Sequence, residues 1–186
     1  MGEELSKLVT TNIKQEDIFN VLVVIDLQKQ FRDENGEYEK CIGYVKKRFE
    51  DSYILGTIFT NFNDSMYEKH LKWSGCKDVD YTDIEYPYHH LLLKRSYGIN
   101  QNDGFVHSLG AILEFAEKQQ NSCVPKIKYQ LIGCDADACV LASAFELWDK
   151  GYDFEILSDY IYTTAEDIDK NMILKIMKRN FGDCVK

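Results

Sequence analysis

The sequence predicts an α/β protein with a doubly wound, three-layer α/β/α fold, in which helices cover both faces of a mainly parallel central sheet. Short apolar runs alternate with segments of helical periodicity along most of the chain, and this alternation is typical of such folds. The run VLVVI at residues 21–25 is continuously apolar, as expected for a central strand that is covered on both sides. Polar residues follow several of the predicted strands, where doubly wound sheets bind their ligands.

Four further apolar runs predict the other strands. They cover residues 53–60 (YILGTIFT), 91–93 (LLL), 127–132 (IKYQLI) and 154–157 (FEIL). Three of the five runs end beside a residue of interest: Asp26 follows the first, Lys94 follows LLL, and Gly133 follows IKYQLI. Because the carboxyl ends of parallel strands meet at one edge of the sheet, we expect these three positions to converge.

Three helices are predicted between the strands. Residues 38–49 and 105–116 carry apolar side chains at helical spacing, which indicates amphipathic helices. Residues 138–150 are apolar nearly all round, so we expect this helix to be buried. Gly151 follows it directly and is expected to end it, as glycine commonly does at the C-terminal end of a helix.

A fourth helix is predicted near the end of the chain. We expect it to begin at Thr163 or Thr164, each followed three residues later by an acidic side chain in a capping-box pattern. Its acidic start and basic end, which includes Lys178 and Arg179, suit the helix dipole.

The chain of 186 residues is long enough for one domain with a substantial core, and we expect a single domain over residues 1–186. Residues 1–19 are polar and are expected to form a lead-in. Residues 61–90 form a long stretch without clear periodicity. Because connections of this length in compact domains are commonly functional, we expect this stretch to form a lid or a pocket wall.

Composition and charge exclude several classes of function. The formal net charge is -9, without a compensating basic stripe, which argues against a nucleic-acid partner. The apolar run near the N-terminus is too short to span a bilayer or to form an export signal, so we expect neither membrane association nor secretion. The six cysteines include no CxxC pair, which favours free thiols in a reducing, cytoplasmic compartment.

Three residues are candidates for chemistry. Asp26 directly follows five aliphatic residues, a placement that suits a general base, although taken alone it is better explained as a turn or N-cap residue. Cys139 follows a strand in the first turn of a predicted helix, where the helix dipole is expected to lower its pKa; its position fits a small core cysteine equally well. Lys94 could stabilise a thiolate, although most lysines are only solvated surface residues.

Together these residues give the chain a specific resemblance. The segments VLVVIDLQKQF, LLLKRSYG and LIGCDADACVLASAFELWDKGYDFEILSDY resemble the three signature blocks of the isochorismatase-like cysteine hydrolases. Nicotinamidases, N-carbamoylsarcosine amidases and ureidoacrylate amidohydrolases belong to that superfamily. The resemblance covers residues 21–179, and the last block is the most specific.

The resemblance implies a role for each matching residue. Asp26 matches the family's base, Lys94 its lysine, and Cys139 the nucleophile in the pattern G-x-x-T-D-x-C-V. The peptide bond between Cys134 and Asp135 should be the family's cis bond, and the backbone N–H groups of Asp135 and Cys139 should form the oxyanion hole. A substrate pocket is expected to include four further residues, namely Gln28, Phe31, Trp73 and Tyr97.

Two departures from the family pattern bear on substrate and metal. Ala136 stands where the family commonly has threonine, so a hydroxyl group is missing near the site. The segment TNFNDSMYEKH lacks the Asp-x-His pair that holds a metal ion in nicotinamidases. His70, His89 and His90 are better explained as surface or loop residues than as ligands. We therefore expect no metal and no other cofactor, and the absent pair argues against nicotinamide as the substrate.

The resemblance implies a hydrolase that cleaves a C–N bond of a small amide, carbamoyl or ureido compound through a thioester, in a homodimer or homotetramer. Two alternatives remain: a non-catalytic small-molecule-binding or scaffold protein on the same fold, and a vinyl-ether hydrolase of the isochorismatase type, which works without the cysteine. A phosphate or dinucleotide binder is disfavoured because no glycine-rich loop of the GxGxxG or GxxxxGKS kind follows a strand.

Overall fold

The computed structural model describes residues 18–99, 104–120 and 126–186, so most of the expected lead-in over residues 1–19 lies outside the described residues. Its centre is a five-stranded sheet in the order β3-β2-β1-β4-β5, and every neighbouring pair is parallel. The strands are β1 (Ile18–Ile25), β2 (Tyr53–Phe59), β3 (His90–Lys94), β4 (Lys126–Gly133) and β5 (Phe154–Ile161). The predicted parallel α/β sheet is thereby confirmed.

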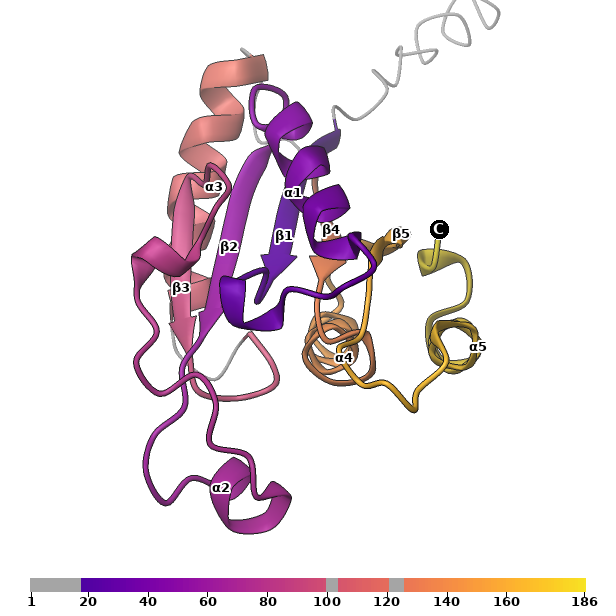
Figure 1. Cartoon of the computed structure of the whole chain (residues 1–186). Helices are drawn as coiled ribbons and strands as arrows, with labels where there is room; N and C mark the ends of the chain where they lie inside the picture. The colour runs from indigo at the N-terminus through magenta and orange to yellow at the C-terminus, as the bar shows by residue number, and fades with distance from the viewer. Residues whose placement is uncertain (1–17, 100–103, 121–125) are drawn as a thin grey trace, which may run out of the picture.

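Helices cover both faces of this sheet (Figure 1). The helices are α1 (Glu37–Arg48), α2 (Met66–Leu71), α3 (Gly104–Gln120), α4 (Leu141–Asp149) and α5 (Lys170–Phe181). Alternate side chains of β1 point to opposite faces. Val21 and Val23 belong to a core shared with α3, α4 and α5, whereas Leu22 and Val24 belong to a second core shared with α1. The sheet thus lies between two helical layers, with one core on each face, which gives the predicted three layers.

The segment between β2 and β3 extends beyond the carboxyl ends of the strands (Figure 1). It contains α2 and a short 3-10 helix, Tyr81–Asp83. Ser65 caps α2 by accepting a hydrogen bond from the Glu68 backbone N–H at 3.2 Å. The stretch that lacks periodicity in the sequence is therefore ordered by local capping rather than by a long amphipathic helix.

The predicted start of the last helix is wrong. Helix α5 begins at Lys170, where the Asp169 side chain accepts a hydrogen bond from the Asn171 backbone N–H at 2.9 Å. Thr163 and Thr164 precede it without capping it, because their hydroxyl groups bind the carboxylates of Asp137 and Asp135 instead.

The helix predicted at residues 138–150 begins as a π-helical turn, Ala136–Val140, and continues as α4. The expectation that it is buried all round is wrong in part. Phe145 is 39% exposed and Trp148 is 50% exposed, and both pack against Phe181 of α5 on only one side. Among the described residues, no helix combines the length and the apolar character that crossing a membrane requires.

The end of β4 approaches β1 very closely. Gly133 has a φ of +110°, and a Cβ atom at this position would overlap the carbonyl oxygen of Ile25. The next N–H group, from Cys134, donates to that same carbonyl at 3.0 Å. Because only glycine fits there, the strand can turn sharply into the segment that carries Cys139.

Candidate active site

Asp26 lies at the carboxyl end of the central strand and is completely buried. Its φ of +45° is unusual for a residue with a side chain and costs about 1–3 kcal/mol. Thr57 of β2 holds this conformation. Its hydroxyl accepts from the Asp26 backbone N–H at 3.0 Å and donates to the Asp26 Oδ1 at 2.6 Å. The neighbouring strand therefore fixes both the backbone and the carboxylate of Asp26.

Lys94 ends β3 and is only 3% exposed. Its Nζ lies 2.6 Å from the Asp26 Oδ2 and donates to the carbonyl oxygens of Ser96 at 2.7 Å and Tyr97 at 3.1 Å. Burial lowers the pKa of Lys94, but the Asp26 charge and the interaction with the neighbouring Cys139 outweigh this effect and leave the pKa above its ordinary value. The ammonium group is therefore charged and held in one place.

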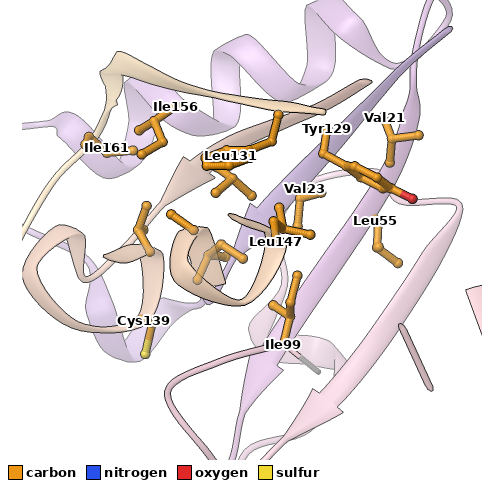
Figure 2. Packing of buried hydrophobic residues seen from close by; sticks show 14 of the residues in the cluster. Val21, Val23, Leu55, Ile99, Tyr129, Leu131, Cys139, Leu147, Ile156 and Ile161 are labelled. Atoms are coloured by element: carbon orange, nitrogen blue, oxygen red, sulfur yellow. The ribbon is translucent and has the colours of Figure 1, made fainter. Parts of the chain in front are cut away.

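Cys139 lies in the π-helical turn between β4 and α4, where it is 7% exposed. Figure 2 shows it at the margin of the core, with its sulfur directed away from Leu131 and Ile161. The thiol lies close enough to Asp26 and Lys94 for both side chains to shift its pKa. The structure thus brings together the three residues that the sequence analysis selected.

The expectation that the helix terminus lowers the Cys139 pKa is wrong. Burial raises this pKa well above its ordinary value, the Asp26 charge raises it further, and Lys94 offsets only part of the increase. The resting group is therefore a neutral thiol between a carboxylate and an ammonium. Transfer of the thiol proton to Asp26 would move one negative charge from oxygen to sulfur without changing the net charge of the buried cluster.

The turn that leads to Cys139 is held at several points. The peptide bond between Cys134 and Asp135 is cis. Ala136 is completely buried, and its N–H donates to the Tyr162 carbonyl at 2.8 Å. The Asp135 carbonyl accepts from the N–H groups of Ala138 at 3.1 Å and Val140 at 3.0 Å.

The Asp135 side chain is anchored on the segment that follows β5. Its Oδ1 accepts from the Thr164 backbone N–H and from the Thr164 hydroxyl, both at 2.8 Å. Burial raises the pKa of Asp135; the Thr164 hydrogen bonds lower it, while the charges of Asp137 and Asp26 raise it. The Asp135 carboxyl group, four residues before Cys139, is therefore harder to ionise than an ordinary aspartate.

Cys139 lines a cavity of about 370 Å³. Three of the predicted pocket residues, Phe31, Trp73 and Tyr97, line it. The stacked rings of Phe31 and Trp73 have centroids 6.3 Å apart. The cavity wall therefore combines the segment after β1, the stretch between β2 and β3, and the segment after β3.

The predicted place of Gln28 in the pocket wall is wrong. Gln28 is completely buried. Its Oε1 accepts from the Phe59 N–H at 2.8 Å and its Nε2 donates to the Phe59 carbonyl at 3.1 Å. Gln28 thereby fixes the end of β2 and, with it, the Phe59 ring, which does line the cavity.

Other residues of the site escaped the sequence analysis. Thr57 lies inside an apolar strand, where a buried hydroxyl without an obvious partner is a usable signal. Phe59 and Tyr67 line the cavity, as does Thr164. Their roles depend on where their segments fold back, which no local pattern in the sequence indicates.

Among the described residues, no histidine lines the cavity that contains Cys139. The Nδ1 of His89 accepts from the Ile54 N–H at 3.0 Å, and its ring stacks on Phe49 and Tyr53. Burial lowers the pKa of His89. His70 belongs to the exposed surface of α2. In the part of the chain that the structure describes, no three His, Cys, Asp or Glu side chains gather in a way that could hold a metal ion.

Neither a protein-family model nor a curated protein sequence matches this chain. Solved structures do match it. N-carbamoylsarcosine amidase from Thermoplasma acidophilum is 21% identical, with a TM-score of 0.62, and the match covers 88% of this chain and 93% of that one. The pyrazinamidase of Pyrococcus horikoshii in complex with zinc is 16% identical, with a TM-score of 0.62 and coverages of 90% and 97%.

A third match is an isochorismatase-like hydrolase from Alkaliphilus metalliredigens, which is 18% identical with a TM-score of 0.61. That match covers 87% of this chain and 91% of the other. The similarity extends over nearly the whole length of each protein. The chain therefore has the isochorismatase-like hydrolase fold.

Proposed function

We propose that this protein is a cysteine-dependent hydrolase that cleaves a C–N bond of a small amide, carbamoyl or ureido compound. One observation carries the proposal: a buried thiol lines a cavity and lies close enough to a carboxylate and an ammonium, themselves 2.6 Å apart, for both to shift its pKa. A nucleophile beside a general base and a fixed cation is the arrangement that acyl transfer needs.

In the first step, Asp26 takes the thiol proton and the Cys139 thiolate attacks the carbonyl carbon. Lys94 stabilises the sulfur anion before the attack. The N–H groups of Asp135 and Cys139 hold the oxygen anion of the tetrahedral intermediate. Protonated Asp26 then gives its proton to the leaving nitrogen as the C–N bond breaks, which leaves a thioester on Cys139.

In the second step, water takes the place of the departed amine. Asp26, again a carboxylate, removes a proton from this water, which attacks the thioester carbonyl. Collapse of the second intermediate breaks the C–S bond, releases the acid and returns the proton to the thiol. The same carboxylate thus acts as base and acid in turn, and the buried cluster returns to its starting charge.

The size of the cavity supports a small substrate. At about 370 Å³ it lies near the lower end of the range for small-molecule sites. The homodimer or homotetramer that the resemblance implies stays a prediction.

The test is ammonia release from a panel of primary amides, N-carbamoyl compounds and ureido acids, with the thioester trapped by rapid acid quench and mass spectrometry. We expect turnover for at least one compound and an acyl adduct on the Cys139 peptide. The variant Cys139→Ala should lose about 10⁴-fold or more in rate. Cys184→Ala serves as the matched control, because Cys184 lies in the C-terminal 3-10 helix away from the cavity.

Two outcomes would overturn the proposal. Full amide turnover by Cys139→Ala would exclude the cysteine as the nucleophile. Cleavage of a vinyl ether that survives in Cys139→Ala and is lost in Asp26→Asn would favour ether hydrolysis. Absence of turnover on the whole panel, with a Cys139 that reacts no differently from Cys184 toward alkylating agents, would favour a binding or scaffold protein.

A further inference from the structure

The cavity above Cys139 is walled mainly by aromatic rings. Five of its lining residues are aromatic: Phe31, Phe59, Tyr67, Trp73 and Tyr97. They come from four segments of the chain that the fold brings to one place. A wall of this kind suits an apolar planar group or a cation, because the face of an aromatic ring carries partial negative charge.

Several of these rings are inclined to one another. Tyr67 meets Phe59 edge-on at 5.1 Å between centroids and an interplanar angle of 76°, and it meets Tyr97 at 5.1 Å and 69°. Trp73 is tilted by 40° relative to Phe59 at 5.9 Å. Phe31 and Trp73 are nearly parallel, at 14° and 6.3 Å between centroids, while the other rings are inclined to them. The wall therefore presents ring faces and edges in several orientations around a compact group.

One charged side chain lines the same cavity. Asp135 is a lining residue, and both of its recorded hydrogen bonds, from Thr164, go to Oδ1. Among the residues that the structure describes, no hydrogen bond or ion pair involves Oδ2, and no lysine or arginine pairs with this carboxylate. The second oxygen therefore remains available to a ligand.

The charge of Asp135 is not balanced within the site. Lys94 is already paired with Asp26, and Asp137 lies two residues further on, bound to the Thr163 hydroxyl. Asp135 and Asp137 are therefore two acidic side chains at or near the cavity that form no ion pair with a lysine or arginine among the described residues, within a chain whose formal net charge is -9. A negative pocket attracts cations and repels anions.

We propose that the substrate carries a positive charge close to its scissile carbonyl, in the form of a primary or quaternary ammonium group held by the aromatic wall and by the Asp135 carboxylate. This inference rests on the proposed hydrolase function, because it names the substrate class of that site. Asp135 is then a specificity-determining residue through its side chain, in addition to the role proposed for its backbone N–H.

Charged thiol reagents test the pocket without any turnover. The thiolate of Cys139 attacks the sulfenyl sulfur of a methanethiosulfonate, which forms a mixed disulfide and releases methanesulfinate. The matched reagents are 2-(trimethylammonium)ethyl, 3,3-dimethylbutyl and 2-sulfonatoethyl methanethiosulfonate, which are cationic, neutral and anionic. Each rate at Cys139, followed by peptide mapping, is divided by the rate of the same reagent with free 2-mercaptoethanol.

We expect the normalised rate of the cationic reagent to exceed that of the neutral one by about tenfold or more, and the anionic reagent to be slowest. Since both reagents meet the same thiolate, the ratio does not depend on the Cys139 pKa. In Asp135→Asn the ratio of the cationic to the neutral rate should fall to about one third of its native value or less. The asparagine oxygen can still accept the two Thr164 hydrogen bonds, so the turn should stay in place.

Two further variants test whether the preference depends on Asp135 in particular and on the aromatic wall. Asp137→Asn removes a nearby charge whose carboxylate already binds Thr163, and it should keep more than half of the preference. Trp73→Leu should reduce the preference without altering any carboxylate. Equal rates for the cationic and neutral reagents in the native protein would overturn the inference, as would an undiminished preference in Asp135→Asn.

A pair of amides separates this inference from the proposed function. Betaine amide and 3,3-dimethylbutanamide have nearly the same shape and differ in charge. Faster ammonia release from betaine amide, lost in Cys139→Ala, supports both proposals. Cys139-dependent hydrolysis of the neutral amide alone overturns the inference and leaves the hydrolase. A cationic reagent preference without hydrolysis of any amide supports the cation pocket and overturns the hydrolase.

Discussion

The floor and the wall of the cavity are built in different ways. On the floor, Asp26, Lys94 and Cys139 are at most 7% exposed, and each is attached to a strand end or to the turn that follows it. In the wall, Tyr97 is 42% exposed and Leu71 is 61% exposed, and the segment between β2 and β3 contains only α2 and a short 3-10 helix among its described residues.

This difference separates two kinds of constraint. A change to one charged group on the floor leaves its partner buried and unpaired, which is costly. The rings of the wall share their contacts among several neighbours, so one ring can change while the others keep the segment folded. We therefore expect reactivity to be set by the floor and substrate choice by the wall.

The largest expected effect is that of Asp26→Asn. Loss of the general base should lower turnover by about 10²- to 10⁴-fold. The same change should speed alkylation of Cys139 by iodoacetamide at a fixed pH. The reason is that the Asp26 charge helps to raise the pKa of the thiol, so its removal moves the alkylation curve to lower pH.

Asp51→Asn is the control for this experiment, since that exposed carboxylate lies beside the amino end of β2. In the native protein the alkylation rate should still be rising with pH above pH 9. Slower alkylation in Asp26→Asn than in the native protein would contradict the placement of the carboxylate against the thiol.

A second effect concerns stability. Lys94→Met leaves the buried Asp26 without its cation and should lower the free energy of unfolding by about 3–5 kcal/mol. The pKa of Lys94 is raised, so its stabilising charge is present at neutral pH and is lost only as the pH rises through that pKa. Urea unfolding between pH 6 and 9 should show a constant difference from the native protein.

The matched control is Lys77→Met. Lys77 lies 2.6 Å from Glu68, but both side chains are partly exposed, at 29% and 34%. This pair should contribute about 0–1 kcal/mol. Similar losses of unfolding free energy in Lys94→Met and Lys77→Met would show that burial does not make the Lys94–Asp26 pair the more important one.

Thr57→Val should have an intermediate effect. The valine keeps the shape but removes the hydroxyl that binds the Asp26 backbone and carboxylate. We expect a loss of about 1–3 kcal/mol in unfolding free energy and a fall in kcat of about tenfold or more from misplacement of the base. Thr57→Ser keeps the hydroxyl and should retain most of the unfolding free energy and most of kcat. If Thr57→Ser is as impaired as Thr57→Val, the effect is due to packing of the methyl group rather than to the hydroxyl.

The smallest effect on folding is expected in the wall. Trp73→Leu should raise KM several-fold with little change in kcat, because it removes binding that the ground state and the transition state share. Its cost in unfolding free energy should be about 1 kcal/mol, comparable with the value of aromatic pairs. Trp148→Leu, at the other tryptophan, should leave KM unchanged; a large loss of kcat in Trp73→Leu would place the ring in the reaction itself.

The sequence was sufficient to predict the floor because each part of it has a local signal. Asp26, Lys94 and Gly133 each follow an apolar run, and parallel strands bring such positions to one edge. The three layers and the mainly parallel sheet followed from the alternation of apolar runs and helical segments. The direction of the Cys139 pKa could not be predicted, since it depends on burial and on a carboxylate more than a hundred residues away.

The wall and its supports were harder to predict. Gln28 has no local feature that separates a pocket residue from one bonded to the Phe59 backbone. Thr163 and Thr164 have a valid capping pattern, but the carboxylates of Asp137 and Asp135 compete for their hydroxyl groups. A tertiary contact of this kind overrides local propensity, and no single window of sequence contains both partners.

The central position of β1 has a consequence for biosynthesis. One edge of β1 pairs with β2, about thirty residues later in the chain, while the other pairs with β4, where Ile18 meets Lys126 and Ile25 meets Gly133. Because the N-terminal part of the chain is synthesised first, one edge of the apolar β1 stays unpaired until β4 has left the ribosome. We expect the nascent protein to depend on chaperones during that interval, and truncations that end before β4 to aggregate through this edge.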